Sequence, residues 1–400
     1  MPIQRACLLL TAILAGLSSL AQQAIWGVPT IISPEIHPDN TVTFRLMSPT
    51  SSHVEVSGDF LPPKRVTAPW GEQEIEGTLP MERDSTGLWS VTTPTPVAPE
   101  LYLYSFIVDG LRTTDPANVY VIRDTGTVSN IFIVPGNESR PYTVQPVPHG
   151  SVTRRWYHSN SLGMDRRMTV YTPAGYEACD TCRYPVLYLL HGMGGDEEAW
   201  GALGRATQIL DNLIAAGDAV PMIVVMPNGN ADLPSAPGEG PAGLVPPTTR
   251  LPKTMEGSFE EAFPEIVSFI DSNYRTIPDK PHRAIAGLSM GGLHSLHISK
   301  QNPDMFDYIG LFSPAINPRE GATSYIYEDS DKKLARQFAA HPALYWIAIG
   351  KKDFLYNDNK AFRDKLDAAG YPYTYRESDG GHIWKNWRIY LSEFLPQLFK

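Results

Sequence analysis

The chain has 400 residues, of which 42% are hydrophobic and 19% are charged, a composition typical of a globular protein with a sizeable core. Its length suits two domains better than one. The formal net charge of −10 argues against nucleic acid as a partner, because nucleic-acid-binding proteins present basic surfaces to phosphate.

Residues 1–21 are typical of a secretion signal. Arg5 supplies a positive charge ahead of the apolar run Leu8–Leu20, and Ser19–Ala21 has the small-x-small pattern of a cleavage site. A membrane anchor is the alternative, but the run is short for a span of ~20 residues. Cys7 precedes this run instead of following it, which argues against a lipid anchor. We expect an exported protein, secreted or periplasmic, with no stable membrane insertion after the signal is removed.

Residues 22–140 are predicted to form a β-sandwich, because short runs alternate between apolar and polar residues and no helical stretch interrupts them. The clearest candidate strands are Thr41–Leu46, His53–Ser57 and Leu101–Val108, the last of which runs into an Asp-Gly turn. Residues 141–150 contain three prolines and no periodicity, so we interpret them as a linker.

Residues 151–400 change to alternating strand and helix patterns, which predicts an α/β domain with a mostly parallel sheet flanked by helices. Val186–Leu190 and Met222–Met226 are apolar throughout, as expected of strands that helices cover on both faces. The other candidate strands are Met168–Tyr171, Ala284–Ala286, Tyr308–Phe312, Tyr345–Ile349 and Tyr373–Arg376, and amphipathic stretches lie at Phe259–Tyr274 and Asn359–Ala369.

Residues 228–253 do not fit a compact core, since they are rich in Pro and Gly and have no period. Loops of this length are usually functional or disordered. The segment directly follows an apolar strand, so it emerges at the sheet edge where open α/β folds bind ligands. We expect it to form a lid or a wall of the site.

Cys179 and Cys182 are the only cysteines after the predicted signal. Their Cys-x-x-Cys spacing also occurs in redox motifs and zinc sites, but no second cysteine pair is present to complete a zinc site. A local structural disulfide suits an oxidising compartment and is our interpretation, with two idle thiols as the alternative.

The strongest chemical signal is the pattern Gly-x-Ser-x-Gly at residues 287–291. A candidate strand precedes it and a helix is expected over Gly292–Lys300, which is the strand–turn–helix context of a nucleophile elbow. The glycines permit the strained turn that exposes the hydroxyl of Ser289. Ser289 is therefore the candidate nucleophile.

A serine hydroxyl needs a neighbouring base to accept its proton, and in this fold the chain order is Ser, then Asp or Glu, then His. His382 is the candidate base, because it follows a strand on a glycine-rich loop, whereas His341 precedes a strand at the opposite edge. Asp353 follows the strand before that loop and is the candidate acid. Its competitors are Asp358, interpreted as a helix N-cap, and Asp379.

Acyl transfer also requires hydrogen-bond donors for an oxyanion. The backbone N–H of Met290, directly after the nucleophile, is one expected donor. The second is expected from Met193 in the glycine-rich segment His191–Gly195, which follows an apolar strand. We interpret His191 as a residue that holds this loop and not as a catalytic base.

Three segments carry a resemblance to the esterase-D-like α/β-hydrolases and, within them, to the feruloyl esterases of xylan-degrading systems. They are His191–Gly195 with Trp200, His282–Gly292, and Gly380–His382 with Trp384. The resemblance spans about Thr153–Leu398 and implies hydrolysis of hydroxycinnamoyl esters on hemicellulose such as arabinoxylan. It departs at residues 228–253 and at the two lysines before Asp353, both of which affect the shape of the pocket.

The N-terminal domain resembles the Ig-like E-set and carbohydrate-binding modules that precede many glycan-active enzymes. Residues Tyr104–Gly110 and Thr114–Asn118 carry this likeness. Such modules often bind no glycan and pack on the catalytic unit, which is the role we expect here.

The sequence therefore predicts a serine carboxylic-ester hydrolase that works through an acyl-enzyme on Ser289, and it shows no cofactor motif and no metal site. Esters of plant cell-wall polysaccharides or oligosaccharides are the expected partners. Trp200 and Trp384 are the candidate walls of an aromatic acyl slot, the alternative for each being a place in the core. The other functions compatible with the sequence are an esterase for acetyl-xylan or another small acyl ester, a siderophore-lactone esterase, and a glycan-binding protein with an inactive hydrolase domain.

Overall fold

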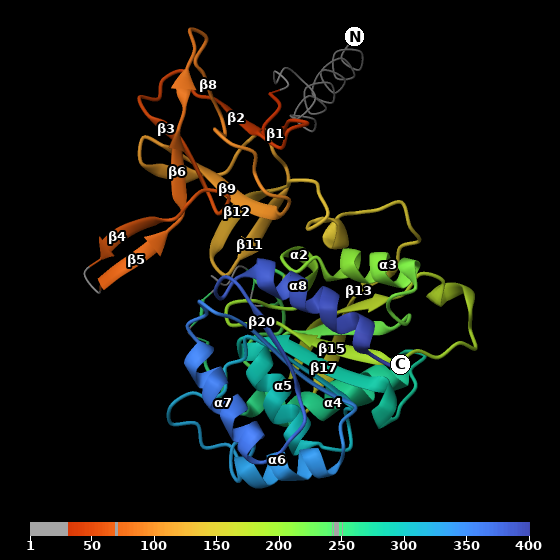
Figure 1. Ribbon diagram of the computed structural model, residues 1–400. Coiled ribbons are helices and arrows are strands. Elements are labelled where there is room, and N and C mark those ends of the chain that lie inside the picture. The colour runs from red at the N-terminus through yellow and green to blue at the C-terminus, as the bar shows by residue number, and fades with distance from the viewer. Residues whose placement is uncertain (1–30, 69–70, 242, 244–247, 250) are drawn as a thin grey trace, which may run out of the picture.

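The computed structural model describes residues 31–68, 71–241, 243, 248–249 and 251–400, so the predicted signal at residues 1–21 lies outside them. Antiparallel β-sheets occupy residues 35–133, and an α/β unit follows (Figure 1). Within these described ranges, every helix is too short or too polar to cross a membrane.

Two antiparallel sheets pack face to face in the N-terminal part. Because side chains alternate along a strand, one face of β2 (Val42–Met47) turns inward and buries Phe44. Phe44 meets Tyr104 and Phe132 of the other sheet at ring-centroid distances of 5.0 and 5.6 Å. One aromatic core therefore joins the two sheets, and the prediction of a β-sandwich is confirmed.

The strand order of the N-terminal sheets is as follows. The four-stranded sheet runs β1 (Glu35–Ile36), β2, β8 (Leu88–Thr92) and β7 (Glu82–Arg83). The six-stranded sheet runs β11 (Val121–Asp124), β12 (Thr127–Ile133), β9 (Leu101–Val108), β3 (Val54–Gly58) and β6 (Gly77–Pro80), with β10 (Leu111–Thr113) on β9. β4 (Lys64–Ala68) and β5 (Gly71–Ile75) pair with each other as a separate arm.

The α/β unit is built on one eight-stranded sheet. Its order is β13 (Ser151–Ser159), β14 (Met164–Thr172), β16 (Ile223–Pro227), β15 (Val186–Leu190), β17 (Arg283–Leu288), β18 (Tyr308–Phe312), β19 (Leu344–Gly350) and β20 (Thr374–Ser378). β13 and β14 are antiparallel, and the strands from β16 to β20 are parallel. The expected α/β fold with a mostly parallel sheet is thus confirmed, and the antiparallel edge is an addition to it.

Helices cover both faces of this sheet (Figure 1). One face packs against α4 (Ser258–Asn273), α5 (Met290–Gln301), α6 (Ser330–Ala339) and α7 (Tyr356–Ala368). The other face packs against α2 (Ala199–Ala202), α3 (Ala206–Ala216) and α8 (Trp384–Phe394). The apolar strands alternate between the two layers, since Val186 and Tyr188 face the first set of helices and Leu187 faces the second.

The N-terminal sheets and the α/β unit share part of one core. Leu101 of β9 belongs to the same buried cluster as α3 and α8. Next to it, the guanidinium of Arg388 on α8 donates to the Glu100 carboxylate at 3.0 Å and to the carbonyl oxygen of Leu203 at 2.8 Å. Both charged side chains are almost completely buried, at 2% and 5% exposed, so the pair joins the two parts away from water.

The segment interpreted as a linker, residues 141–150, is held against α3 by hydrogen bonds at both of its ends. Asn212 of α3 donates to the carbonyl oxygen of Pro141 at 2.9 Å, and Asp211 accepts from the backbone N–H of Gly150 at 2.9 Å. The side chain of Tyr142 is buried and donates its hydroxyl to Glu100. The prolines of this segment therefore mark a fixed connection and not a loose one.

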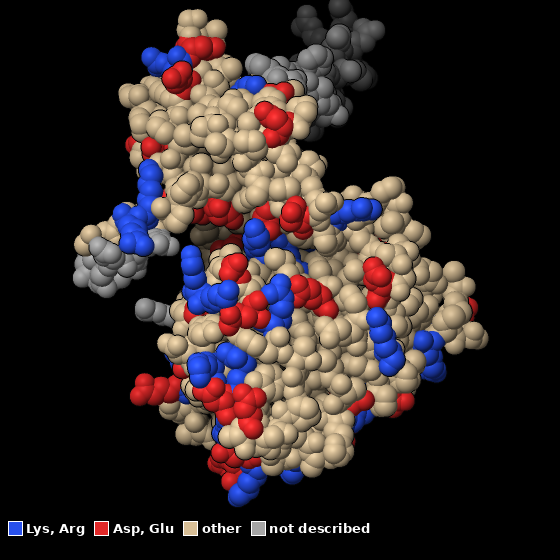
Figure 2. Space-filling model, in the orientation of Figure 1, with Lys and Arg blue, Asp and Glu red and all other residues tan. Residues whose placement is uncertain are grey.

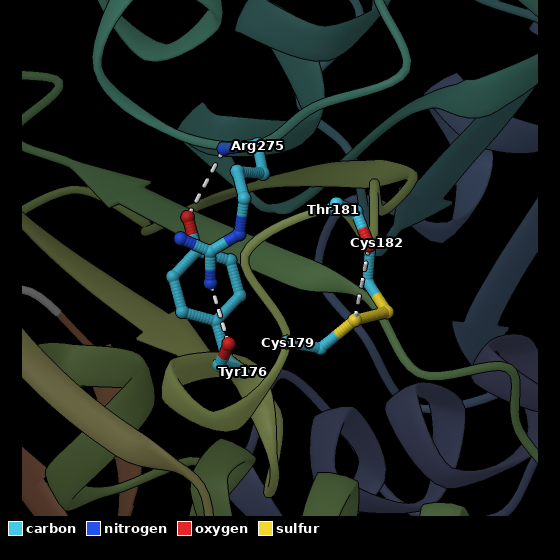
Figure 3. The surroundings of a disulfide bond; sticks show 5 residues. All are labelled: Tyr176, Cys179, Thr181, Cys182 and Arg275. Atoms are coloured by element: carbon cyan, nitrogen blue, oxygen red, sulfur yellow. Dashed lines mark hydrogen bonds between the residues drawn. A yellow bond between two sulfur atoms is a disulfide. The ribbon is translucent and has the colours of Figure 1, made fainter.

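Cys179 and Cys182 form a disulfide, so the prediction of a local structural bond is confirmed (Figure 3). The bond lies just after Tyr176, whose ring contacts the guanidinium of Arg275 at 3.8 Å from the ring centroid. The Tyr176 hydroxyl also accepts the backbone N–H of Arg275 at 3.0 Å. These contacts fix the loop between β14 and β15 against the segment that follows α4.

Candidate active site

The four loops that carry the candidate residues all leave the same edge of the sheet. Ser289 directly follows β17, Asp353 follows β19, His382 follows β20, and Met193 follows β15. These strands are parallel, so their carboxyl ends meet at one edge, which is where open α/β folds place ligands.

Ser289 has the backbone of a nucleophile elbow, with φ 53° and ψ −114°. Its neighbours must be small. A Cβ on Gly287 would lie 2.3 Å from the carbonyl oxygen of Gly291, and a Cβ on Gly291 would lie 2.4 Å from that of Leu190. The Ser289 N–H donates to the Phe312 carbonyl at 2.9 Å, which helps hold a conformation that costs on the order of 1–3 kcal/mol.

His382 and Asp353 are joined by a hydrogen bond of 2.9 Å between Nδ1 and Oδ2. The Asp353 side chain is fully buried, and its Oδ1 accepts the backbone N–H of Leu355 at 2.9 Å. The His382 ring is 18% exposed and packs edge-on against Trp387 at 4.9 Å. With Nδ1 donating to the carboxylate, Nε2 is the nitrogen left free to accept a proton.

The two competing carboxylates lie elsewhere. The Asp379 side chain is 96% exposed and pairs with Lys351 at 3.2 Å. Asp358 lies within the first turn of α7, whose N-cap is Leu355, so the interpretation of Asp358 as the N-cap is wrong. α7 begins three residues earlier than the apolar pattern predicted, because the hydrogen-bonded turn that starts at Asp353 leads directly into the helix.

The loop after β15, residues Gly192–Gly195, lies against the elbow and is called the oxyanion loop below. A Cβ on Gly192 would lie 3.4 Å from Cβ of Ser289. The Met193 side chain is 46% exposed, and Met290, the first residue of α5, is buried. The N–H groups of a first helical turn have no partner within the helix, so that of Met290 is free to donate.

His191 supports the oxyanion loop from beneath. Its ring is buried, with Nδ1 at 2.8 Å from the Gly192 carbonyl oxygen and Nε2 accepting the N–H of Gly229 at 2.7 Å. Burial lowers the pKa of His191 from 6.5 to about 4, so the ring is neutral near pH 7. These bonds engage both ring nitrogens in holding two loops together.

A cavity of about 750 Å³ lies between the N-terminal sheets and the α/β unit. His382, Met193 and Leu288 line its floor, and Phe60, Tyr102 and Ile122 come from the N-terminal sheets. Figure 2 shows the hollow between the two parts, with acidic and basic side chains gathered around it. The site therefore combines apolar and charged walls, and the N-terminal sheets supply one side of it.

The segment 228–253 contributes to this cavity with its described part. Ala236, Pro237 and Glu239 line the wall, and Asn228 is completely buried. Residues 242, 244–247 and 250 of the segment lie outside the described residues.

The two tryptophans of the predicted acyl slot occupy different places. Trp200 is 1% exposed, donates its indole N–H to the Leu190 carbonyl at 2.9 Å and does not line the cavity. Its prediction as a substrate-binding residue is wrong, because α2 turns its indole down onto the sheet beneath the oxyanion loop. Trp384 does line the cavity, and it packs edge-on against Trp200 at 5.5 Å.

Sequence reasoning missed a buried network that shapes this wall. Arg166 and Arg167 are adjacent on β14 and point to opposite faces of the sheet. Arg166 donates to the carbonyl oxygen of Asn230 at 3.0 Å, while Arg167 pairs with Glu197 at 2.7 Å and Glu239 at 2.9 Å. Two adjacent arginines at the start of a strand whose second half is almost completely buried are the signal in the sequence for buried ion pairs.

A family model for Esterase matches residues 159–398, which is more than half of the chain. The chain belongs to the Esterase family. The match begins at the end of β13 and extends beyond α8, so it covers the elbow and all the loops described above. The resemblance to α/β-hydrolases of the feruloyl esterase type is confirmed.

The chain is 31% identical over 372 residues to an endo-1,4-beta-xylanase/feruloyl esterase of Xylanibacter ruminicola, a match of 92% of this chain and 46% of that protein. The chain thus spans just under half of that relative's length.

Solved structures extend the likeness to the fold. A CE1 ferulic acid esterase from Anaeromyces mucronatus in complex with ferulic acid is 25% identical, with a TM-score of 0.55, over 66% of this chain and 96% of that one. The enterobactin esterase from Shigella flexneri is 19% identical, with a TM-score of 0.59, over 89% of this chain and 92% of that one. Because the second match covers 89% of this chain, the likeness in fold extends over both the α/β unit and much of the N-terminal sheets.

Replacing the two tryptophans with alanine should have different effects. Trp200→Ala should lower the free energy of unfolding by about 3–5 kcal/mol, since it empties a large core site. Trp384→Ala should lower kcat/KM for an aromatic ester by roughly 10- to 200-fold, because it removes a cavity wall. Urea unfolding and steady-state kinetics measure the two effects. Trp384→Phe, which retains an aromatic ring, is the control; equal kinetics for Trp384→Ala and the parent would contradict the assignment.

The buried His191 should make stability depend on pH. Its folded pKa of about 4 lies below the ordinary 6.5, so its contribution is complete above pH 6.5 and is lost as the pH falls towards 4. The expected loss is up to ~1.4 kcal/mol per pH unit, because only the unfolded chain binds the proton there. Denaturant unfolding at several pH values gives the free energy of unfolding as a function of pH. Between pH 6.5 and 4 this free energy should fall less steeply for His191→Gln than for the parent. The exposed-site variant His53→Gln should show the same pH dependence of the free energy of unfolding as the parent. An identical pH dependence for all three proteins would refute the prediction.

Proposed function

We propose that this esterase is a serine carboxylic-ester hydrolase that removes feruloyl or related hydroxycinnamoyl groups from hemicellulose such as arabinoxylan. The observation that carries the proposal is the hydrogen-bonded pair His382–Asp353 at the same sheet edge as the strained Ser289, beside a cavity of about 750 Å³. A nucleophile, an oriented base and room for a substrate are the parts that ester hydrolysis requires.

In the proposed reaction, Oγ of Ser289 attacks the ester carbonyl carbon while Nε2 of His382 accepts the hydroxyl proton. Asp353 holds the ring through Nδ1 and stabilises the imidazolium. His382 then returns the proton to the leaving alcohol, which leaves an acyl-enzyme on Ser289. Water, activated by the same histidine, releases the carboxylic acid and restores the serine.

The negative charge that develops on the carbonyl oxygen needs donors on one side of Ser289. We assign this role to the backbone N–H groups of Met290 and Met193. Met290 begins α5, whose N-terminal end carries a partial positive charge that also favours an oxyanion. The contact between Gly192 and Ser289 supports the placement of the oxyanion loop beside the nucleophile.

Two features support an aromatic acyl group on a sugar as the substrate. The cavity walls include Phe60, Tyr102 and Trp384, which suit a planar ring, together with charged side chains that suit hydroxyl groups. The relatives named above include a xylanase/feruloyl esterase and a ferulic acid esterase that binds ferulic acid. Plant cell-wall polysaccharide or oligosaccharide esters are accordingly the proposed partners.

We further propose that the protein acts outside the cytoplasm, secreted or in the periplasm. The pattern of residues 1–21 is that of an export signal, and the Cys179–Cys182 disulfide is compatible with an oxidising compartment. Fractionation of cells that produce the full chain, followed by mass determination of the N-terminus, tests this placement.

Ser289→Ala should abolish turnover and leave the fold intact, with a loss of about 10⁴-fold or more in kcat. Kinetics with methyl ferulate and circular dichroism measure the two properties. If the purified variant retained a tenth of the parent activity, the nucleophile assignment would fail.

Asp353→Asn should lower kcat by up to about 10⁴-fold, because an amide in that place favours the wrong tautomer of His382. Asp358→Asn and Asp379→Asn are matched controls, since both are solvent-exposed carboxylates, one in the first turn of α7 and the other on the loop that carries His382. Neither control should change kcat by more than a few-fold. A severe loss in either would move the acid away from Asp353.

Methyl ferulate should be hydrolysed with a higher kcat/KM than a simple acetyl ester, because an acetyl group leaves most of the cavity empty. The decisive assay measures ferulate and acetate released in parallel from arabinoxylan that carries both esters. Release of acetate with no ferulate would favour an acetyl-xylan esterase instead.

A further inference from the structure

We propose that the tip of the β11–β12 hairpin, residues Arg123–Gly126 of the N-terminal sheets, positions the oxyanion loop of the hydrolase unit and thereby takes part in catalysis. The inference rests on the proposed ester hydrolysis and adds a positioning role for residues far from the hydrolase sequence. Figure 1 shows the end of β11 reaching down towards α2 and α8, the two helices that follow the oxyanion loop and His382.

The first contact is between Thr125 and Gly194. Gly194 has φ +80°, and a Cβ there would lie 2.4 Å from Oγ1 and 2.9 Å from Cγ2 of Thr125. The threonine side chain thus rests directly on the backbone of the oxyanion loop. Gly194 is the residue after Met193, whose N–H is the proposed donor, so the contact fixes the backbone beside that donor.

The second contact is an ion pair. The Arg123 guanidinium pairs with the carboxylate of Asp196, which is only 2% exposed. The other oxygen of that carboxylate accepts the N–H of Glu198 at 3.0 Å, so Asp196 anchors the chain where the oxyanion loop enters α2. Arg123 also donates to the carbonyl oxygen of Thr125 at 2.9 Å, which ties the hairpin tip to the same anchor.

The tip reaches the histidine loop as well. Asp124 and Trp384 line the same cavity, and Trp384 lies two residues after His382. Burial raises the pKa of the Asp124 carboxyl, and the neighbouring Trp384 side chain opposes this rise. The hairpin tip therefore bridges two loops that come from different strands of the catalytic sheet, β15 and β20.

The backbone of Thr125 indicates that this arrangement is held against strain. Its φ is 53°, a value that a β-branched residue rarely adopts. Residues kept in such conformations cluster at functional sites, where the surrounding contacts over-determine them. Here the surrounding contacts are those to Gly194 and Arg123.

The oxyanion loop needs support of this kind because glycines make up three of its four residues. Glycine gives the backbone little preference for one conformation, whereas an oxyanion donor must lie about 2.7–3.1 Å from the developing charge. Within the hydrolase unit, His191 holds the loop through the Gly192 carbonyl. From the N-terminal sheets, Thr125 of the hairpin tip, which also lines the cavity, holds it at Gly194.

The test compares Arg123→Ala, Thr125→Gly and Arg123→Lys with the parent enzyme. The matched control is Arg45→Ala, which removes another ion-paired arginine of the N-terminal sheets: the Arg45 side chain is 27% exposed, against 28% for Arg123, and it pairs with Glu35. The substrates are p-nitrophenyl acetate, which is too small to fill the cavity, and methyl ferulate. Phenylboronic acid, which forms a tetrahedral adduct with an active serine, reports on the oxyanion donors.

We expect kcat for both esters to fall about 10- to 100-fold in Arg123→Ala and Thr125→Gly, with KM changed less than about threefold, because small displacements of catalytic groups have costs of this order. The inhibition constant of phenylboronic acid should rise by a similar factor. Arg123→Lys should recover part of kcat, and Arg45→Ala should match the parent.

Unchanged kcat for p-nitrophenyl acetate, or a rise confined to KM for methyl ferulate, would overturn the proposal and make the tip a cavity wall only. Melting temperature and titration of active serines with a fluorophosphonate separate slow catalysis from unfolding. If Arg123→Ala proves unfolded, Thr125→Gly decides, since it removes the contact and relieves strain. A parent enzyme that cleaves neither ester would instead refute the proposed function.

Discussion

The backbone of Ser289 is the constraint on which the rest of the hydrolase unit depends. A residue at φ 53° and ψ −114° between a strand and a helix forces α5 so close to β15 and β17 that Gly287 and Gly291 admit no side chain. The hydrogen-bonded His382 and Asp353 leave the same edge of the sheet as Ser289, and the oxyanion loop lies against the elbow.

Much of this arrangement is predictable from the sequence because it has local causes. Apolar runs of strand length lie where β15, β16 and β18 are found, and the elbow pattern contains its own turn and helix start. The pairing of His382 with Asp353 follows from chain order, since each lies on a loop after a parallel strand. The hydrogen-bonded geometry itself, and the burial of the carboxylate, come only from the structure.

The rest was beyond sequence reasoning because it depends on contacts between distant segments. Trp200 and Trp384 have equivalent places beside their motifs, yet one lies beneath the oxyanion loop and the other on the cavity wall. Residues 141–150 are interpreted as a linker from their prolines and lack of periodicity, and nothing in the sequence indicates that Asn212 and Asp211 of α3 dock this segment. The pairing of Arg167 with Glu197 and of Arg123 with Asp196 joins residues 30 and 73 positions apart, and no periodic pattern encodes such partners.

The buried pair of Glu100 and Arg388 has a consequence for how such proteins evolve by module exchange. A β-rich module with its own core can be exchanged between genes as a unit. Here, however, the Glu100 carboxylate of the N-terminal sheets neutralises the Arg388 guanidinium, which is buried in the hydrolase unit. A recombinant that replaced the module without that carboxylate would leave Arg388 unpaired, a defect of about 3–5 kcal/mol. A replacement module would keep this stability only if it carried an acid at the equivalent strand end, so the two modules are coupled by one buried charge pair.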